Sequence, residues 1–112
     1  MVLDTQGGPN WVNNWCVAPI IVDPNQDEIY YTPLYYVMTH FSKYIRPGAV
    51  IIDVENNDSD LMVTAAQNPD NSIAVVLFNE GNDEKSFNIK LNEYSKIITI
   101  SPQAIQTVII NQ

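Results

Sequence analysis

Several residue types on which catalytic and metal sites depend are scarce in this sequence. Its 112 residues include one cysteine, one histidine and five lysines and arginines. The single cysteine, Cys16, excludes an internal disulfide and leaves the redox compartment open. Metal binding needs several His, Cys or carboxylate ligands that converge, whereas the acidic residues here are scattered through turns. We therefore expect neither a structural disulfide nor a metal or other cofactor.

Long apolar runs and basic surfaces are also missing. No stretch reaches the roughly 18 continuous apolar residues of a membrane span, and the first residues lack the basic and apolar regions of a signal peptide. The chain carries 13 acidic residues against five basic ones, a formal charge of −8, which would repel a phosphate backbone. We expect no membrane span and no nucleic-acid partner.

The chain does contain enough apolar material for a small folded unit. Hydrophobic residues make up 46% and aromatic residues 10% of the sequence, which is typical of globular proteins and not of disordered chains. A length of 112 residues is too short for a whole barrel enzyme. Residues 49–112 hold nine of the 13 acidic side chains, so we expect this second part to carry the solvent-facing acidic surface.

The first part of the chain begins with a shaped loop. Its apolar opening runs directly into a Gly-Gly-Pro turn and reads like the end of a strand cut from something larger, in which Met1 would be an internal methionine. Turn-forming residues dominate positions 5–14. The apolar run at 18–22 is too short, and too close to prolines, for a helix.

A change of period at Thr32-Pro33 predicts one helix. The threonine supplies a capping hydroxyl and the proline suits the first helical position. Four apolar residues follow at spacings of four, three and four, namely Leu34, Met38, Phe41 and Ile45. We predict an amphipathic helix over about residues 33–45, which ends at Arg46-Pro47-Gly48 with Lys43 and Arg46 placed where the helix dipole favours cations.

After Gly48 the period becomes two. Six short segments rich in Val, Ile and Thr follow at regular spacing, at residues 49–55, 61–67, 72–79, 85–91, 96–100 and 104–111. Residues 85–91 alternate between apolar and polar, whereas 73–78 are almost wholly apolar, as in a central strand covered on both sides. We predict an antiparallel meander folded into a β-sandwich of about six strands.

Two constellations could carry catalytic chemistry, and a structural role is the better hypothesis for each. Cys16 and His40 could form a nucleophile–base dyad, but the histidine lies on the predicted helix and is better explained as a packing or capping residue. Asn79-Glu80 has the form of the acid/base pair of many retaining sugar hydrolases. Here it opens a predicted hairpin turn at 80–84, where a carboxylate is usually solvated. Asn57-Asp58-Ser59 matches the glycosylation sequon and is equally a plain polar turn.

The loop at residues 7–15 offers a different chemistry. Its two tryptophans and three asparagines combine flat apolar faces with amide hydrogen-bonding groups, as sugar-binding loops do. Composition alone favours the alternative that Trp11 and Trp15 plug the core beneath a polar loop.

Longer motifs make the sequence specific. Read in order, these blocks are Gly7-Gly8-Pro9-Asn10-Trp11, then 18–23 (Ala-Pro-Ile-Ile-Val-Asp), 35–48 (Tyr-Tyr-Val-Met-Thr-His-Phe-Ser-Lys-Tyr-Ile-Arg-Pro-Gly) and 100–107 (Ile-Ser-Pro-Gln-Ala-Ile-Gln-Thr). In their order and spacing they resemble the C-terminal end of the glycoside hydrolases of family 30, of the lysosomal glucosylceramidase type. The resemblance covers essentially all of the chain.

This resemblance implies a (β/α)8 barrel with a β-sandwich packed on its side. Residues 1–48 would be the end of the barrel, comprising the exit of its last strand, an active-site loop from residue 4 to about 31 and the last helix, at about 33–45. Residues 49–112 would form the C-terminal sandwich domain. The expected fold is thus mostly β, an antiparallel sandwich preceded by the last loop and helix of a barrel, and the expected partner is the rest of that barrel.

The same resemblance implies a retaining β-glucosidase that acts on glucosylceramide or a related β-glucoside, in sphingolipid catabolism. The family's two catalytic glutamates would lie upstream of residue 1, so this chain would hold no catalytic residue and would be inactive alone. Asn14 matches an asparagine that lines the sugar pocket, and Trp15 matches an aromatic position near the aglycone, where the best-known members have phenylalanine. Asn10 and Trp11 would be loop scaffolding. Members of this type are lysosomal or secreted.

Two alternatives remain open. Family 30 also contains xylan- and β-1,6-glucan-cleaving enzymes, and the missing loops would decide the substrate. In a different class, the chain would be a stand-alone β-sandwich module that binds carbohydrate or has a structural role, and it would then fold cooperatively in isolation.

Overall fold

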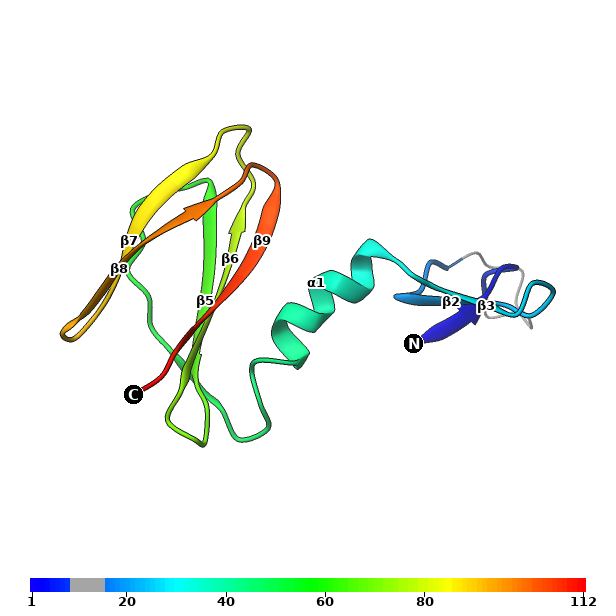
Figure 1. The fold of residues 1–112 in the computed structure, drawn as a ribbon, viewed down its shortest axis with the longest axis horizontal. Helices are drawn as coiled ribbons and strands as arrows, with labels where there is room; N and C mark the ends of the chain where they lie inside the picture. Colours follow the sequence, from blue (N-terminus) through cyan, green and yellow to red (C-terminus); the bar gives the residue numbers. More distant parts are fainter. Residues whose placement is uncertain (9–15) are drawn as a thin grey trace. The chain divides into compact units, whose positions relative to one another are not determined.

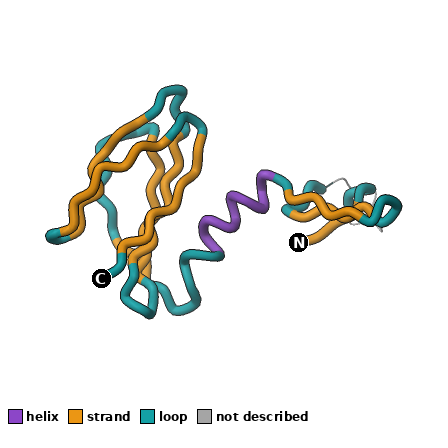
Figure 2. Tube along the Cα trace, viewed as in Figure 1, coloured by secondary structure: helices purple, strands orange, loops and turns teal. Residues whose placement is uncertain are grey.

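The structure is a computed structural model that describes residues 1–8 and 16–112. It is mostly β, with a single helix among the described residues. The chain divides into two compact units, Met1–Thr39 and His40–Gln112. Figure 1 labels the elements and Figure 2 colours them by secondary structure. The described helix is too short and insufficiently apolar to cross a membrane.

The first unit is built on a small three-stranded sheet. β1 (Val2–Asp4) pairs in parallel with β2 (Ile20–Asp23), which pairs antiparallel with β3 (Glu28–Tyr31). The turn between β2 and β3 is held by the Asp23 carboxylate, whose Oδ1 accepts hydrogen bonds from the backbone N–H groups of Asn25 and Gln26. Sequence reasoning treated this stretch as loop. The Ile-Ile-Val and Ile-Tyr-Tyr runs suffice for two short strands once a tight turn joins them.

Helix α1 (Pro33–Ser42) begins where the sequence predicts and ends three residues earlier. Beyond it, the Ile45 N–H still donates to the Phe41 carbonyl at 2.8 Å, so the chain makes one further turn before leaving the helical path. The Arg46 guanidinium donates to the Ser42 carbonyl at 3.3 Å, in line with the predicted placement of cations at the helix end. No side chain of α1 is fully buried.

The second unit is the predicted β-sandwich, with six strands. Four of them form one sheet in the order β4-β5-β6-β9: β4 (Val50–Ile52), β5 (Leu61–Gln67), β6 (Ile73–Asn79) and β9 (Ala104–Ile110). The other two, β7 (Lys85–Leu91) and β8 (Tyr94–Ile100), form an antiparallel hairpin that lies over the first sheet (Figure 1). The prediction of a simple meander was wrong, because β6 pairs with β9 and the intervening hairpin belongs to the opposite layer.

The core of the sandwich lies between these two layers. Strand β6 is central, as its apolar sequence predicts, and six of its seven residues are buried. Ile73, Val75 and Leu77 point into the core, against which alternate residues of β7 pack. Ala74 and Val76, on the opposite face of the strand, are also buried. A strand buried on both faces has no polar face to present, which explains the continuous apolar run.

Candidate functional site

The loop after β1 begins with a tight turn. The Asp4 carboxylate accepts a hydrogen bond from the Gln6 N–H at 2.9 Å, and the Asp4 carbonyl accepts one from the Gly7 N–H at 3.1 Å. Gly7 has a φ of 74°, a conformation in which glycine is favoured. The two residues predicted to bind sugar, Asn14 and Trp15, lie outside the described residues, as do Asn10 and Trp11.

The loop after β1 ends at Ala18 and Pro19, just before β2, and Thr32, which follows β3, holds this end by hydrogen bonds. The Thr32 hydroxyl lies 3.0 Å from the carbonyl oxygens of both Ala18 and Pro19, and its N–H donates to the Pro19 carbonyl at 2.9 Å. The hydroxyl predicted to cap α1 therefore donates backward to the loop. As a result, the start of the helix and the end of the loop form one hydrogen-bonded corner, against which Ala18 is fully buried.

Tyrosine side chains pack against one another where β3 leads into α1. The rings of Tyr31 and Tyr35 lie with centroids 4.7 Å apart, and those of Tyr35 and Tyr36 meet edge to face at 5.4 Å. Partial desolvation, together with a hydrogen bond to the Glu28 carboxylate and its negative charge, raises the pKa of Tyr30. Together these tyrosines present an aromatic surface with hydrogen-bonding hydroxyl groups.

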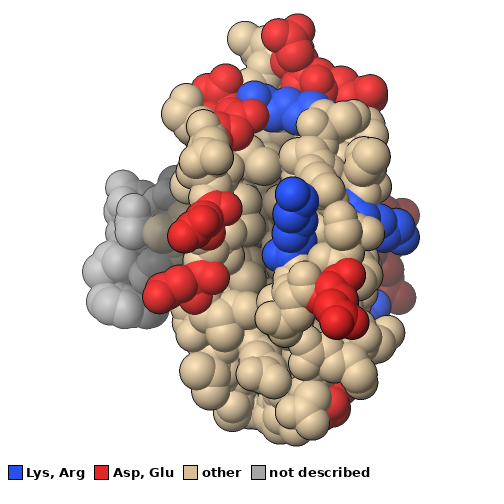
Figure 3. All heavy atoms as spheres, turned by 90° about the vertical axis from the view of Figure 1, so that its left-hand side faces the viewer, with Lys and Arg blue, Asp and Glu red and all other residues tan. Residues whose placement is uncertain are grey.

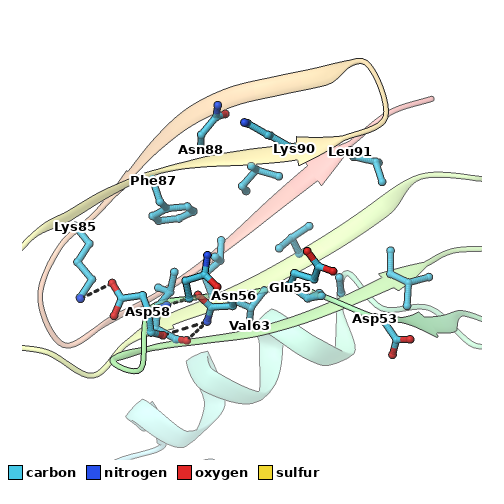
Figure 4. A pocket seen from close by; sticks show the side chains of 18 of the residues that line it. Asp53, Glu55, Asn56, Asp58, Val63, Lys85, Phe87, Asn88, Lys90 and Leu91 are labelled. Atoms are coloured by element: carbon cyan, nitrogen blue, oxygen red, sulfur yellow. Dashed lines mark hydrogen bonds and ion pairs between the residues drawn. The ribbon is translucent and has the colours of Figure 1, made fainter.

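The sandwich contains an open cleft between its two layers, of about 1020 Å³. Figure 4 shows Phe87 and Leu91 of β7 facing Val63 of β5 across it. Its floor is formed by inward-pointing aliphatic residues of the four-stranded sheet, including Leu61, Val75 and Leu77. A sugar site needs converging polar groups on its floor, and this floor is the hydrophobic core itself. The floor of the cleft is therefore apolar and part of the sandwich core.

One ion-pair cluster lies at the rim of this cleft. The Lys85 ammonium is 2.6 Å from Oδ2 of Asp58 and 3.8 Å from Oδ2 of Asp60. The hydrogen bond from Lys85, then that from the Asp60 N–H, lowers the pKa of Asp58, and the same pair raises the pKa of Lys85. In Figure 3, acidic side chains gather at the upper end of the face shown, around basic ones. In the described part of the chain, no group of three or more His, Cys, Asp or Glu is arranged to hold a metal ion.

The Asn79-Glu80 pair plays a structural role. Asn79 is fully buried, and its side chain donates to the carbonyls of Asp83 and Ser101 and accepts from the Gly81 N–H. Glu80 is exposed, as expected of a turn carboxylate. The predicted hairpin at 80–84 was wrong, because β6 and β7 belong to different sheets and the turn crosses between the layers. Asn79 holds that crossing in place.

Cys16 and His40 fall in different units. Nδ1 of His40 lies 2.8 Å from Oγ1 of Thr107 on β9, so the histidine is engaged with the sandwich. Cys16 is half-buried. The contact with Thr107 is consistent with a structural role for His40.

Sequence reasoning missed the role of Asn68. Its buried side chain accepts the Arg46 N–H at 2.9 Å and donates to the Tyr44 carbonyl at 2.8 Å, which ties the chain after α1 to the β5–β6 turn. Asp70 orders the same turn by accepting from the Ser72 N–H and hydroxyl, and these bonds lower the pKa of Asp70. Asn-Pro-Asp-Asn at 68–71 is typical of a turn, but no local signal shows that Asn68 binds residues more than 20 positions away.

Comparison with known families gives two matches that together cover most of the chain. Residues 48–108 match the glycosyl hydrolase family 30 β-sandwich domain, and residues 1–45 match the TIM-barrel domain of the same family. Among solved structures, SrfJ from Salmonella typhimurium superposes with a TM-score of 0.94 at 29% identity, over 99% of this chain and 25% of that one. An endo-β1,6-glucanase shares the fold, with a TM-score of 0.82 at 24% identity, over 95% of this chain and 24% of that one.

Curated relatives point to the same family. Putative glucosylceramidase 2 of Caenorhabditis elegans is 36% identical over 98% of this chain, and the lysosomal acid glucosylceramidase of Mus musculus is 36% identical over 91%. A glucuronoxylanase of Bacillus subtilis is 34% identical over 63%. This chain spans only 22%, 20% and 18% of the length of these three relatives. The described fold and these matches agree: the chain belongs to glycosyl hydrolase family 30.

Proposed function

We propose that this chain is the C-terminal part of a retaining β-glucosidase that acts on glucosylceramide, in sphingolipid catabolism. The observation that carries the proposal is the 36% identity to two proteins named as glucosylceramidases over more than nine-tenths of the chain. The 43% identity to putative glucosylceramidase 1 of C. elegans, over 72% of the chain, adds support. The similarity to the mouse lysosomal protein favours a lysosomal or secreted location.

In this proposal the chain supplies a wall of the sugar pocket and no catalytic carboxylate. The loop that leaves the carboxyl end of β1 is where a barrel enzyme of this kind carries its active-site residues. Asn14 would hydrogen-bond the sugar and Trp15 would pack beside the aglycone. Both catalytic glutamates would come from residues upstream of this chain, which alone would therefore be inactive.

Uncovered apolar surface supports a missing partner structure. On α1, the predicted stripe residues Leu34, Met38 and Phe41 are 47%, 54% and 40% exposed. A helix hydrophobic on one face normally buries that face against another element. The rest of the barrel would cover this stripe, and the division of the chain near residue 48 into barrel end and sandwich follows from the same proposal.

The test uses the longer protein of which, in this proposal, the chain is the C-terminal part. We expect it to release glucose from glucosylceramide at a higher kcat/KM than it shows on glucuronoxylan or β-1,6-glucan. A preference for either polysaccharide would replace the glucosylceramide proposal with the other family activity. Asn14→Ala should lower kcat/KM about tenfold or more, as expected for the loss of one hydrogen bond to substrate worth about 1.4 kcal/mol. Asn10→Ala, at the scaffold position, is the matched control and should have a smaller effect.

Hydrogen exchange distinguishes this proposal from a stand-alone module. In the isolated chain we expect protection across the sandwich strands and little across α1, because the helix lacks its covering surface. Uniform protection of both regions would favour an autonomous binding or structural module.

A further inference from the structure

We propose that Asn57 is an N-glycosylation site. It belongs to the sequon Asn57-Asp58-Ser59, the one Asn-X-Ser/Thr match in the sequence. A sequon alone is a weak signal, since the same three residues suit any polar turn. The inference depends on how the segment 56–60 is folded, and it rests on the proposed lysosomal or secreted location of the protein.

Alternate residues of this segment hold it in place. The Asn56 carboxamide accepts from the Asp58 N–H at 3.0 Å and donates to the carbonyls of Asp58 and Leu61, at 3.2 and 2.5 Å. Oδ1 of Asp58 accepts from the Asp60 N–H at 3.0 Å, and its Oδ2 binds the Lys85 ammonium at 2.6 Å. The side chains of Asn56 and Asp58 are thus committed to the loop and to β7.

The acceptor asparagine and the hydroxyl residue of the sequon are the two left outside this network. Asn57 and Ser59 are both exposed, and neither side chain makes a hydrogen bond to another residue of the described chain. Asn57 stands at the apex of the turn that Asn56 closes, at the mouth of the cleft. A glycan attached to its Nδ2 would displace no contact of the fold and would project from the rim of the sandwich.

The attachment is a group transfer. The oligosaccharide moves from its lipid-linked pyrophosphate donor to the Asn57 amide nitrogen, and a new C–N bond replaces the sugar–phosphate bond. The lipid pyrophosphate leaves with the electron pair of the broken bond, and the amide proton passes to a base of the transferase. The donor and its transferase are those of the secretory pathway. The chain has only to present an accessible asparagine with a hydroxyl two residues later.

In the test, the full chain is expressed in a eukaryotic host with a cleavable leader that directs it into the secretory pathway. Cell extract and medium are analysed together, so that retained and secreted protein are both counted. We expect a mobility shift that a peptide N-glycosidase removes, and conversion of residue 57 to aspartate in the released peptide. Asn57→Gln and Ser59→Ala should each abolish the shift. Asn82→Gln, which changes an exposed loop asparagine outside any sequon, should leave it unchanged.

Ser59→Thr keeps the hydroxyl that the sequon needs, so this variant should keep the mobility shift, and its loss would also contradict the proposal. An unmodified wild-type chain, whether or not the threonine variant is modified, would overturn the proposal. Because the leader delivers the chain regardless of its natural destination, a negative result says nothing against the glucosidase proposal. Likewise, a longer protein without glucosidase activity would leave the glycosylation result standing.

Discussion

Replacing Asn79 with alanine removes the side chain that holds the crossing from β6 to β7. The native carboxamide is fully buried and makes three hydrogen bonds to backbone groups, at 2.8, 3.1 and 3.0 Å. At a net value of about 1 kcal/mol each, their loss should lower the free energy of unfolding by about 3 kcal/mol. With a urea dependence near 2 kcal/mol per M, the unfolding midpoint of the full chain should fall by about 1.5 M.

The assay is urea unfolding of the full chain, followed by far-UV circular dichroism. Asn82→Ala is the matched control, since Asn82 lies in the same turn and is exposed, and it should change the free energy of unfolding by less than about 0.5 kcal/mol. Asn79→Asp adds a pH test. Its carboxylate would face the carbonyls of Asp83 and Ser101, so burial and this contact should raise its pKa in the folded state. The extra destabilisation should then shrink as the pH falls. Equal losses in the free energy of unfolding for Asn79→Ala and Asn82→Ala would refute the structural role of Asn79.

Three further predictions concern the sandwich and the helix. Because Lys85 lowers the pKa of Asp58 in the folded state, the stability that this pair contributes is present above the unfolded pKa of about 3.9 and is lost as pH falls through the lower folded value. The difference in Tm between wild type and Asp58→Asn should therefore disappear in strong acid, and a constant difference from pH 6 to pH 2 would contradict the assignment. Gly48→Ala should lower the free energy of unfolding by about 1–2 kcal/mol in urea, since Gly48 has a φ of 88° and a Cβ there would lie 3.3 Å from Cγ of Pro69. Gly48→Asn should lower it less, because asparagine tolerates this conformation. Equal losses for the two variants would count against backbone strain as the cause. The double variant Leu34→Ser/Met38→Ser should reduce self-association of the isolated chain, measured by light scattering. Tyr36→Ser changes an equally exposed residue off the stripe and should reduce it less. A larger reduction with Tyr36→Ser would exclude the stripe as the associating surface.

Local patterns in the sequence predicted much of this fold. The start of α1 at Pro33 and the six strands after Gly48 follow from a change of period, which depends only on near neighbours. The layering of β7 and β8 could not be predicted in this way. Whether the segment after Asn79 turns back beside β6 or crosses to the other layer depends on contacts such as that between the Asn79 amide and the Ser101 carbonyl, 22 residues away.

The candidate site was predicted from resemblance more than from physical pattern. Trp15 and Asn14 have no periodicity or spacing that marks them as sugar-binding, so only the longer motifs around them suggest that role. Glu80 is the opposite case, in which a catalytic-looking residue is exposed at a turn, as the sequence predicts for a turn carboxylate. The neighbouring Asn79 side chain makes three hydrogen bonds to backbone groups.

We propose that this chain completes a β-glucosidase without holding its proton-transfer groups. The most direct measurement compares glucose release from glucosylceramide by the purified 112-residue chain and by the longer protein that contains it. We predict turnover by the longer protein and none by the chain alone, even when other glycosidases have been excluded. Release of glucose in proportion to the concentration of the isolated chain would contradict the account.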